Sequence, residues 1–114
     1  MSRAKPLRWV GSSYDDLLQF PWAVRRCVGF QLHKVQCGDA PDDWKSFSSV
    51  GPGVREIRVR GEDGAFRVLY LAKFPGGIYV LHCFQKKSQS TASSDVQLAR
   101  ARYLAVLKME RDEK

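Results

Sequence analysis

The chain has 114 residues, of which 44% are hydrophobic, which is typical of one globular domain whose core needs no disulfides or metals. Nineteen Lys and Arg residues against twelve Asp and Glu give a formal net charge of +7, which favours a polyanionic partner such as nucleic acid or an acidic protein. The basic opening residues lack an apolar segment, and no uncharged run approaches the length that crosses a bilayer. We therefore expect no signal peptide and no membrane partner, and we expect a soluble, cytoplasmic protein.

The first third of the chain predicts one strand and two helices. Residues 7–10 form a short apolar strand, and residues 12–20 begin with serines and early acids that favour a helix. Pro21 suits the first turn of a second helix, which ends near Gly38. The apolar positions of this helix recur at helical spacing and comprise Val24, Cys27, Val28, Leu32 and Val35. The basic positions left to face water are Arg25, Arg26 and Lys34.

Residues 39–53 are rich in Pro, Gly and Ser and predict a loop. From residue 54 the apolar period changes to two, and residues 54–60, 66–74 and 78–85 predict three antiparallel strands joined by short turns. In the first of these strands, Glu56, Arg58 and Arg60 alternate with apolar residues, so one sheet face carries a basic row.

Residues 94–97 match a capping box and begin a last helix whose apolar stripe runs from Val96 to Leu107. The expected element order is β-α-α-β-β-β-α. This order predicts one compact α+β domain, residues 1–114, with an antiparallel sheet packed on one side by helices and its other face open to a ligand.

Cys27, Cys37 and Cys83 are odd in number and far apart, and no CxxC pair accompanies them. His33 and Cys37 stand four residues apart, yet two ligands do not make a metal site. We therefore expect no disulfide framework, no metal and no cofactor.

The blocks "REIRVR", "FRVLY" and "LHCFQKKSQST", together with the earlier run "PWAVRRCVGFQLHKVQCG", are similar in order and spacing to HigB-like toxins of the RelE/ParE superfamily. The resemblance covers most of the chain and implies a compact RelE-like domain. It also implies the toxin of a type II toxin–antitoxin pair, an endoribonuclease that cuts messenger RNA on the ribosome. The implied partners are messenger RNA, the ribosome and a HigA-like antitoxin with a helix-turn-helix domain.

RNA cleavage of this kind uses the 2′-hydroxyl as nucleophile, so the enzyme must accept a proton and stabilise charge on the phosphorane. The resemblance assigns phosphate stabilisation to Arg67 and Lys87, with Arg58 and Arg60 sharing in it or positioning RNA. Arg60, Lys86 and Gln89 are the candidate RNA-binding residues, because basic and amide side chains hold the phosphate backbone.

Other interpretations of these residues stay open. His82 is either a catalytic group or, as is more common for a histidine among apolar strand residues, a hydrogen-bonded core imidazole. Arg60 and Lys86 are alternatively solvated strand-edge charges that oppose aggregation. Tyr70 has the opposite strand parity from Arg67 and is expected in the core.

No residue is an evident strong general base, and that role stays unassigned. Two further functions stay open as alternatives. One is a ParE-like toxin directed at gyrase, and the other is a basic RNA-binding module without catalysis.

Overall fold

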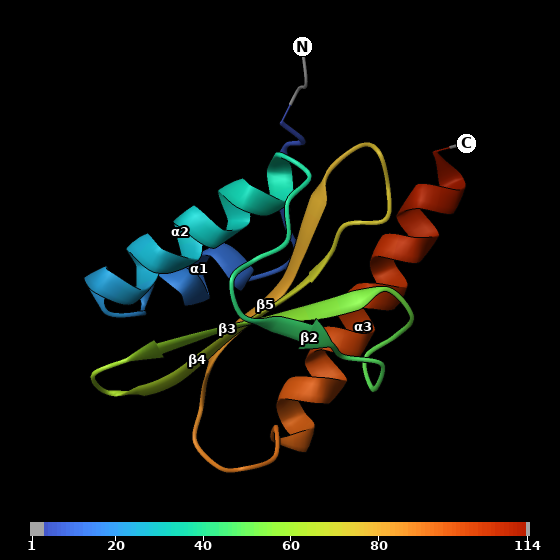
Figure 1. Cartoon of the computed structure of the whole chain (residues 1–114). Helices are drawn as coiled ribbons and strands as arrows, with labels where there is room; N and C mark the ends of the chain where they lie inside the picture. The colour runs from blue at the N-terminus through green and yellow to red at the C-terminus, as the bar shows by residue number, and fades with distance from the viewer. Residues whose placement is uncertain (1–3, 114) are drawn as a thin grey trace.

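The structure, a computed structural model, describes residues 4–113 as three helices and five strands (Figure 1). In chain order the elements are β1 (Leu7–Trp9), α1 (Ser13–Leu18), α2 (Trp22–Gln36), β2 (Trp44–Ser46), β3 (Val54–Gly61), β4 (Gly64–Leu71), β5 (Ile78–Lys86) and α3 (Ser93–Asp112). The α+β class is confirmed, as is the order of the predicted elements. The additional strand β2 lies inside the segment predicted as a loop.

The five strands form one sheet in the order β1-β5-β4-β3-β2. Strands β3, β4 and β5 make the expected antiparallel meander, and β2 adds an antiparallel edge. The other edge differs from the prediction, because β1 runs parallel to β5 and makes the sheet mixed. The tight turn between β3 and β4 depends on Gly64, whose φ of +134° is a conformation that residues with a Cβ rarely adopt.

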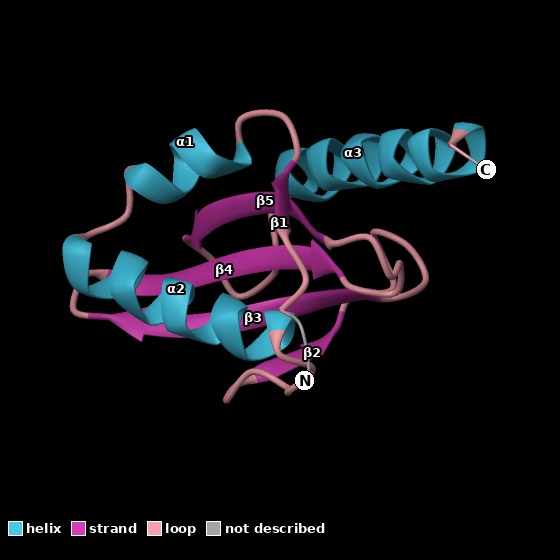
Figure 2. Ribbon diagram, turned by 90° about the horizontal axis from the view of Figure 1, so that it is seen from above, coloured by secondary structure: helices cyan, strands magenta, loops and turns pink. Residues whose placement is uncertain are grey.

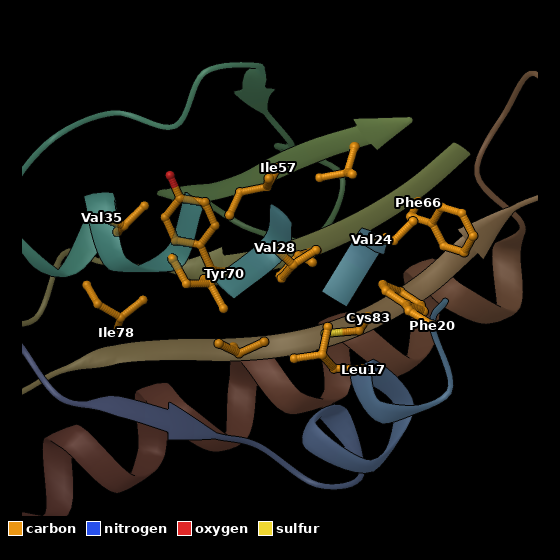
Figure 3. Close-up of a cluster of buried hydrophobic side chains, with 14 residues drawn as sticks. Leu17, Phe20, Val24, Val28, Val35, Ile57, Phe66, Tyr70, Ile78 and Cys83 are labelled. Carbon is orange, nitrogen blue, oxygen red and sulfur yellow. The ribbon is translucent and has the colours of Figure 1, made fainter. Parts of the chain in front are cut away.

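Helices α1 and α2 cover one face of the sheet (Figure 2). Figure 3 shows the core beneath them, in which Val24 and Val28 of α2 meet Ile57 of β3 and Tyr70 of β4. Tyr70 is fully buried on this face, as its parity predicted. Burial of its phenol raises the pKa of Tyr70 above the ordinary value.

Helix α3 covers the opposite face, where Ala99, Tyr103 and Val106 pack in one cluster with Leu69 and Leu81. The expectation of helices on one side only is therefore corrected. The reason is physical: β4 and β5 are apolar on both faces, so each face needs a covering layer.

No helix within residues 4–113 is both long enough and apolar enough to cross a membrane.

Candidate nucleic-acid interface

Strand register gathers the basic residues on the α3 side of the sheet. Arg58 of β3 lies opposite Arg67 of β4, and Arg67 lies opposite Phe84 of β5. In the next row Arg60 and Lys86 flank Ala65. Residues that lie opposite one another project to the same side of a sheet, so these rows share one surface. We call Arg58, Arg60, Arg67 and Lys86 the basic face.

Exposure divides the basic face into an outer and an inner part. Arg60 is exposed, and Arg58 and Lys86 are half-buried. Arg67 exposes only 8% of its surface, and its Nη1 donates a hydrogen bond to the Phe66 carbonyl oxygen at 3.1 Å. The outer residues would therefore meet a ligand first, with Arg67 beneath them.

A buried carboxylate forms an ion pair with Arg67 at a distance too long for a hydrogen bond. Glu56 exposes 2% of its surface, and its Oε1 lies 3.7 Å from Arg67 Nε. Burial lowers the pKa of Arg67, with Arg58 and Arg60 adding to the effect, whereas Glu56 and Asp43 oppose it. Like charges directly opposite one another destabilise a sheet, so Glu56 partly offsets the repulsion between Arg58 and Arg67.

Lys87 and Gln89 lie in the loop that follows β5, and both are exposed. This loop, drawn in orange in Figure 1, lies on the α3 side of the sheet. The Ser88 hydroxyl donates to the Ser90 carbonyl oxygen at 2.8 Å and shapes the turn. The structure thus places Lys87 directly after a residue of the basic face.

His82 joins β5 to the start of α3. Its Nε2 lies 2.7 Å from Asp95 Oδ1, and its ring stacks on Phe84 with centroids 5.0 Å apart. His82 exposes 6% of its surface, and its Nδ1 is buried without a hydrogen-bond partner among the described residues. This environment fits a residue that positions the loop between Lys87 and α3.

The expected capping box does not form, because Ala92 occupies the N-cap and no side chain caps the helix. Asp95 bonds His82 instead.

Three residues near the basic face were missed by sequence reasoning as site residues. Glu56 and Asp95 were seen only as members of a strand row and a capping box. Lys45 of β2 lies opposite Glu56 and adds an exposed cation to this side of the sheet. No pattern in the sequence indicated the position of Lys45, because residues 44–46 were predicted to be part of a loop.

Two cavities are lined by none of the four basic-face residues. One, of about 600 Å³, opens between α1 and β5. Its lining includes His82 and Phe84, together with Asp16 and Asp63 but no Lys or Arg, so it disfavours phosphate. The other, of about 450 Å³, lies at the end of α2. Its Lys5 ammonium already donates to the carbonyl oxygens of Ala72 and Phe74, at 2.8 and 2.9 Å.

Within residues 4–113, no group of three or more His, Cys, Asp or Glu residues is placed to hold a metal ion. The three cysteines are free, and Cys37 Sγ lies 3.7 Å from His33 Nε2 on the exposed side of α2. What the site offers is positive charge on a preformed sheet, with one buried carboxylate that fixes the central arginine.

Fold and site together define a small α+β protein with one strongly basic sheet face. Residues 15–104 match the family model described as phage derived protein Gp49-like (DUF891), and the chain belongs to this family. The family is toxin-like, of the RelE/HigB type. The search of curated proteins found no match to the chain.

Proposed function

We propose that this protein is the toxin of a type II toxin–antitoxin pair and an endoribonuclease that cleaves messenger RNA on the ribosome. The observation that carries the proposal is the basic face, where Arg58, Arg60 and Lys86 surround the buried Arg67. A row of fixed cations on rigid strands suits the stabilisation of a phosphorane, because its charge is met without reorganisation. Membership of a toxin-like family supports the same proposal.

In this proposal, Arg67 and Lys87 stabilise the reacting phosphate, and Arg58 assists them. Arg60, Lys86 and Gln89 hold the RNA backbone on either side. His82 acts by positioning the Lys87 loop through Asp95.

The lack of an exposed general base among the described residues of the basic face supports dependence on the ribosome. Glu56 Oε2 and His82 Nδ1 are both buried, so neither atom is exposed on the basic face. A toxin that supplies mainly charge gains from a template that holds the 2′-hydroxyl in line with the phosphate, since orientation alone contributes a large part of such a barrier. A ribosomal substrate also implies action in the cytoplasm.

The proposed partner is a helix-turn-helix antitoxin that covers the basic face. Rim charges contribute to such an interface in a salt-dependent way, so the complex should weaken as salt is added. Co-expression of the adjacent reading frame tests the partner: growth should recover, and the two proteins should purify together. Continued growth arrest without a complex would remove this partner from the proposal.

A gyrase-directed toxin is the second candidate, and a non-catalytic RNA-binding module the third. Inducing the gene while following transcripts and plasmid topology separates them. Loss of defined messages supports the endoribonuclease, gyrase-linked DNA breaks support the second candidate, and neither change supports the third.

A further inference from the structure

Helix α2 carries large aromatic side chains on its solvent side. Trp22 is 64% exposed and Phe30 is 59% exposed, the two highest values among the exposed large hydrophobic residues. Arg26 lies between them in sequence, and its guanidinium sits 5.2 Å from the Trp22 ring centroid. The three residues stand four apart, so they form one row along the helix. We call Trp22, Arg26 and Phe30 the α2 row.

The α2 row is separate from the basic face. Helices α1 and α2 cover one face of the sheet, and the basic face lies on the other, with α3. A partner that binds the α2 row therefore leaves the basic face open, whatever ligand that face binds.

From these features we propose that the α2 row is a docking surface for an acidic amphipathic helix of another protein. Exposed aromatic residues beside an arginine are the composition that protein interfaces favour at their centres. Four residues advance a helix by about 6 Å, so Trp22 and Phe30 stand about 12 Å apart along the axis. A helix with apolar residues two turns apart matches that separation.

The positive charge of α2 favours an acidic partner. Residues 22–36 contain Arg25, Arg26 and Lys34 but no Asp or Glu. Lys34 is paired with Asp42, whereas Arg26 has no ion-pair partner among the described residues. Glutamates beside the apolar residues of a partner helix would form ion pairs with Arg26.

The same charge argues against two other occupants. A second copy that packed α2 against α2 would bring the Arg25 and Arg26 side chains of both copies together, which is repulsive. Single-stranded RNA needs a continuous cationic groove along its backbone. Here the row offers one unpaired cation between two rings.

The test uses the full chain with two labelled synthetic peptides. Both have leucines at one amphipathic helical face; one has Glu on its flanks, and the other has Lys at the same positions. We expect the acidic peptide to bind more tightly by fluorescence anisotropy. The variant W22A/F30A should bind it at least about tenfold more weakly, because truncated anchors carry most of an interface's free energy. The control L104A removes a side chain of α3 that is 54% exposed, and this variant should bind as the wild type does.

A charge reversal makes the test specific. Arg26→Glu keeps both rings and should reverse the preference, so that the Lys peptide binds more tightly. Equal binding of both peptides, or no loss in W22A/F30A, would overturn the proposal. It would equally be overturned if that variant abolished binding of a single-stranded RNA oligonucleotide or self-association of the protein instead.

Discussion

Arg67 and Glu56 are buried together on the α3 side of the sheet, with Arg67 Nε 3.7 Å from Glu56 Oε1. They expose 9% and 3% of their side chains. Removing one partner of a buried pair leaves an uncompensated charge, which costs about 3–5 kcal/mol. A well-packed apolar replacement of both partners is often neutral or stabilising. The pair therefore fixes Arg67 among like charges more than it stabilises the fold.

We expect Glu56→Ala to lower the free energy of unfolding by about 3 kcal/mol or more, because Arg67 stays buried without its carboxylate. The double variant Glu56→Leu, Arg67→Met should be close to the wild type in stability and inactive as a toxin. Urea unfolding of the two proteins measures both values. A loss below about 1 kcal/mol in Glu56→Ala would show that the two residues are not coupled.

Lys87→Ala should abolish growth inhibition with the fold unchanged, since Lys87 is an exposed loop residue. Loss of a preorganised contact to the transition state typically lowers the rate about a hundredfold or more. Arg67→Ala should have the same effect on toxicity but should also lose stability. The matched control is Lys108→Ala, an exposed lysine on α3. Full toxicity of folded Lys87→Ala and Arg67→Ala proteins would show that the site assignment is wrong.

Asp95→Ala should release the start of α3 from β5, because it removes the hydrogen-bond partner of His82. A hydrogen bond to a charged group contributes about 1.5–3 kcal/mol, and we expect a loss of that size with faster amide exchange in residues 87–95. Gln97→Ala, at an exposed position of the same helix, is the control.

Variants of His82 and Asp95 distinguish a positioning role of His82 from a catalytic role. If His82 acts through Asp95, then His82→Ala and Asp95→Ala should lower cleavage by similar factors, and the double variant should be no worse than either. The alternative outcome is that the His82 variant keeps its stability but loses all cleavage, while Asp95→Ala stays active. That result would assign His82 to proton transfer.

Alkaline pH should destabilise the protein through two buried groups. Burial, with Asp16 adding to it, raises the pKa of Cys83 from 9.0 to about 12. Burial and a hydrogen bond to Glu110 raise the pKa of Tyr79 from 10.0 to about 12. Both acids keep their protons in the folded state at a pH where the unfolded chain has lost them. The stability they contribute is therefore full below about pH 9 and is lost as the pH rises towards 12.

The measurement is the free energy of unfolding across that alkaline range for the wild type and for Cys83→Ala. The variant should lose less stability than the wild type as the pH rises, whatever its stability at neutral pH. Cys37→Ala, which removes an exposed thiol, should follow the wild-type curve. Parallel curves for Cys83→Ala and the wild type would contradict the prediction.

Strand parity carried the successful sequence predictions. Alternation alone predicted that Arg58 and Arg60 lie on one face of the sheet and that Tyr70 and Arg67 lie on different faces. A period of two can be recognised without knowing which distant residues a strand contacts. The buried apolar side of α2 was predicted in the same way, from a period of 3.6.

The failures all concern contacts between distant segments. Strand β2 has only three residues, and its pairing with β3 has no local period to reveal it. The position of α3 depended on which face of β4 and β5 it would cover, and both faces are apolar. The bond from Asp95 to His82 joins residues 13 apart, and no local pattern indicates it. The burial of Glu56 beside Arg67 likewise needed the packed sheet to be seen.

The most direct measurement incubates the purified protein with a defined messenger RNA, with and without translating ribosomes. Because the basic face supplies charge but no exposed general base, we expect site-specific cleavage in the presence of ribosomes and slow or no cleavage of naked RNA. The sites should follow the reading frame, since the face has few side chains that could read bases. Lys87→Ala should abolish the cleavage under both conditions. Rapid cutting of naked RNA at the same positions and the same rate would contradict ribosome dependence and indicate a free-standing ribonuclease.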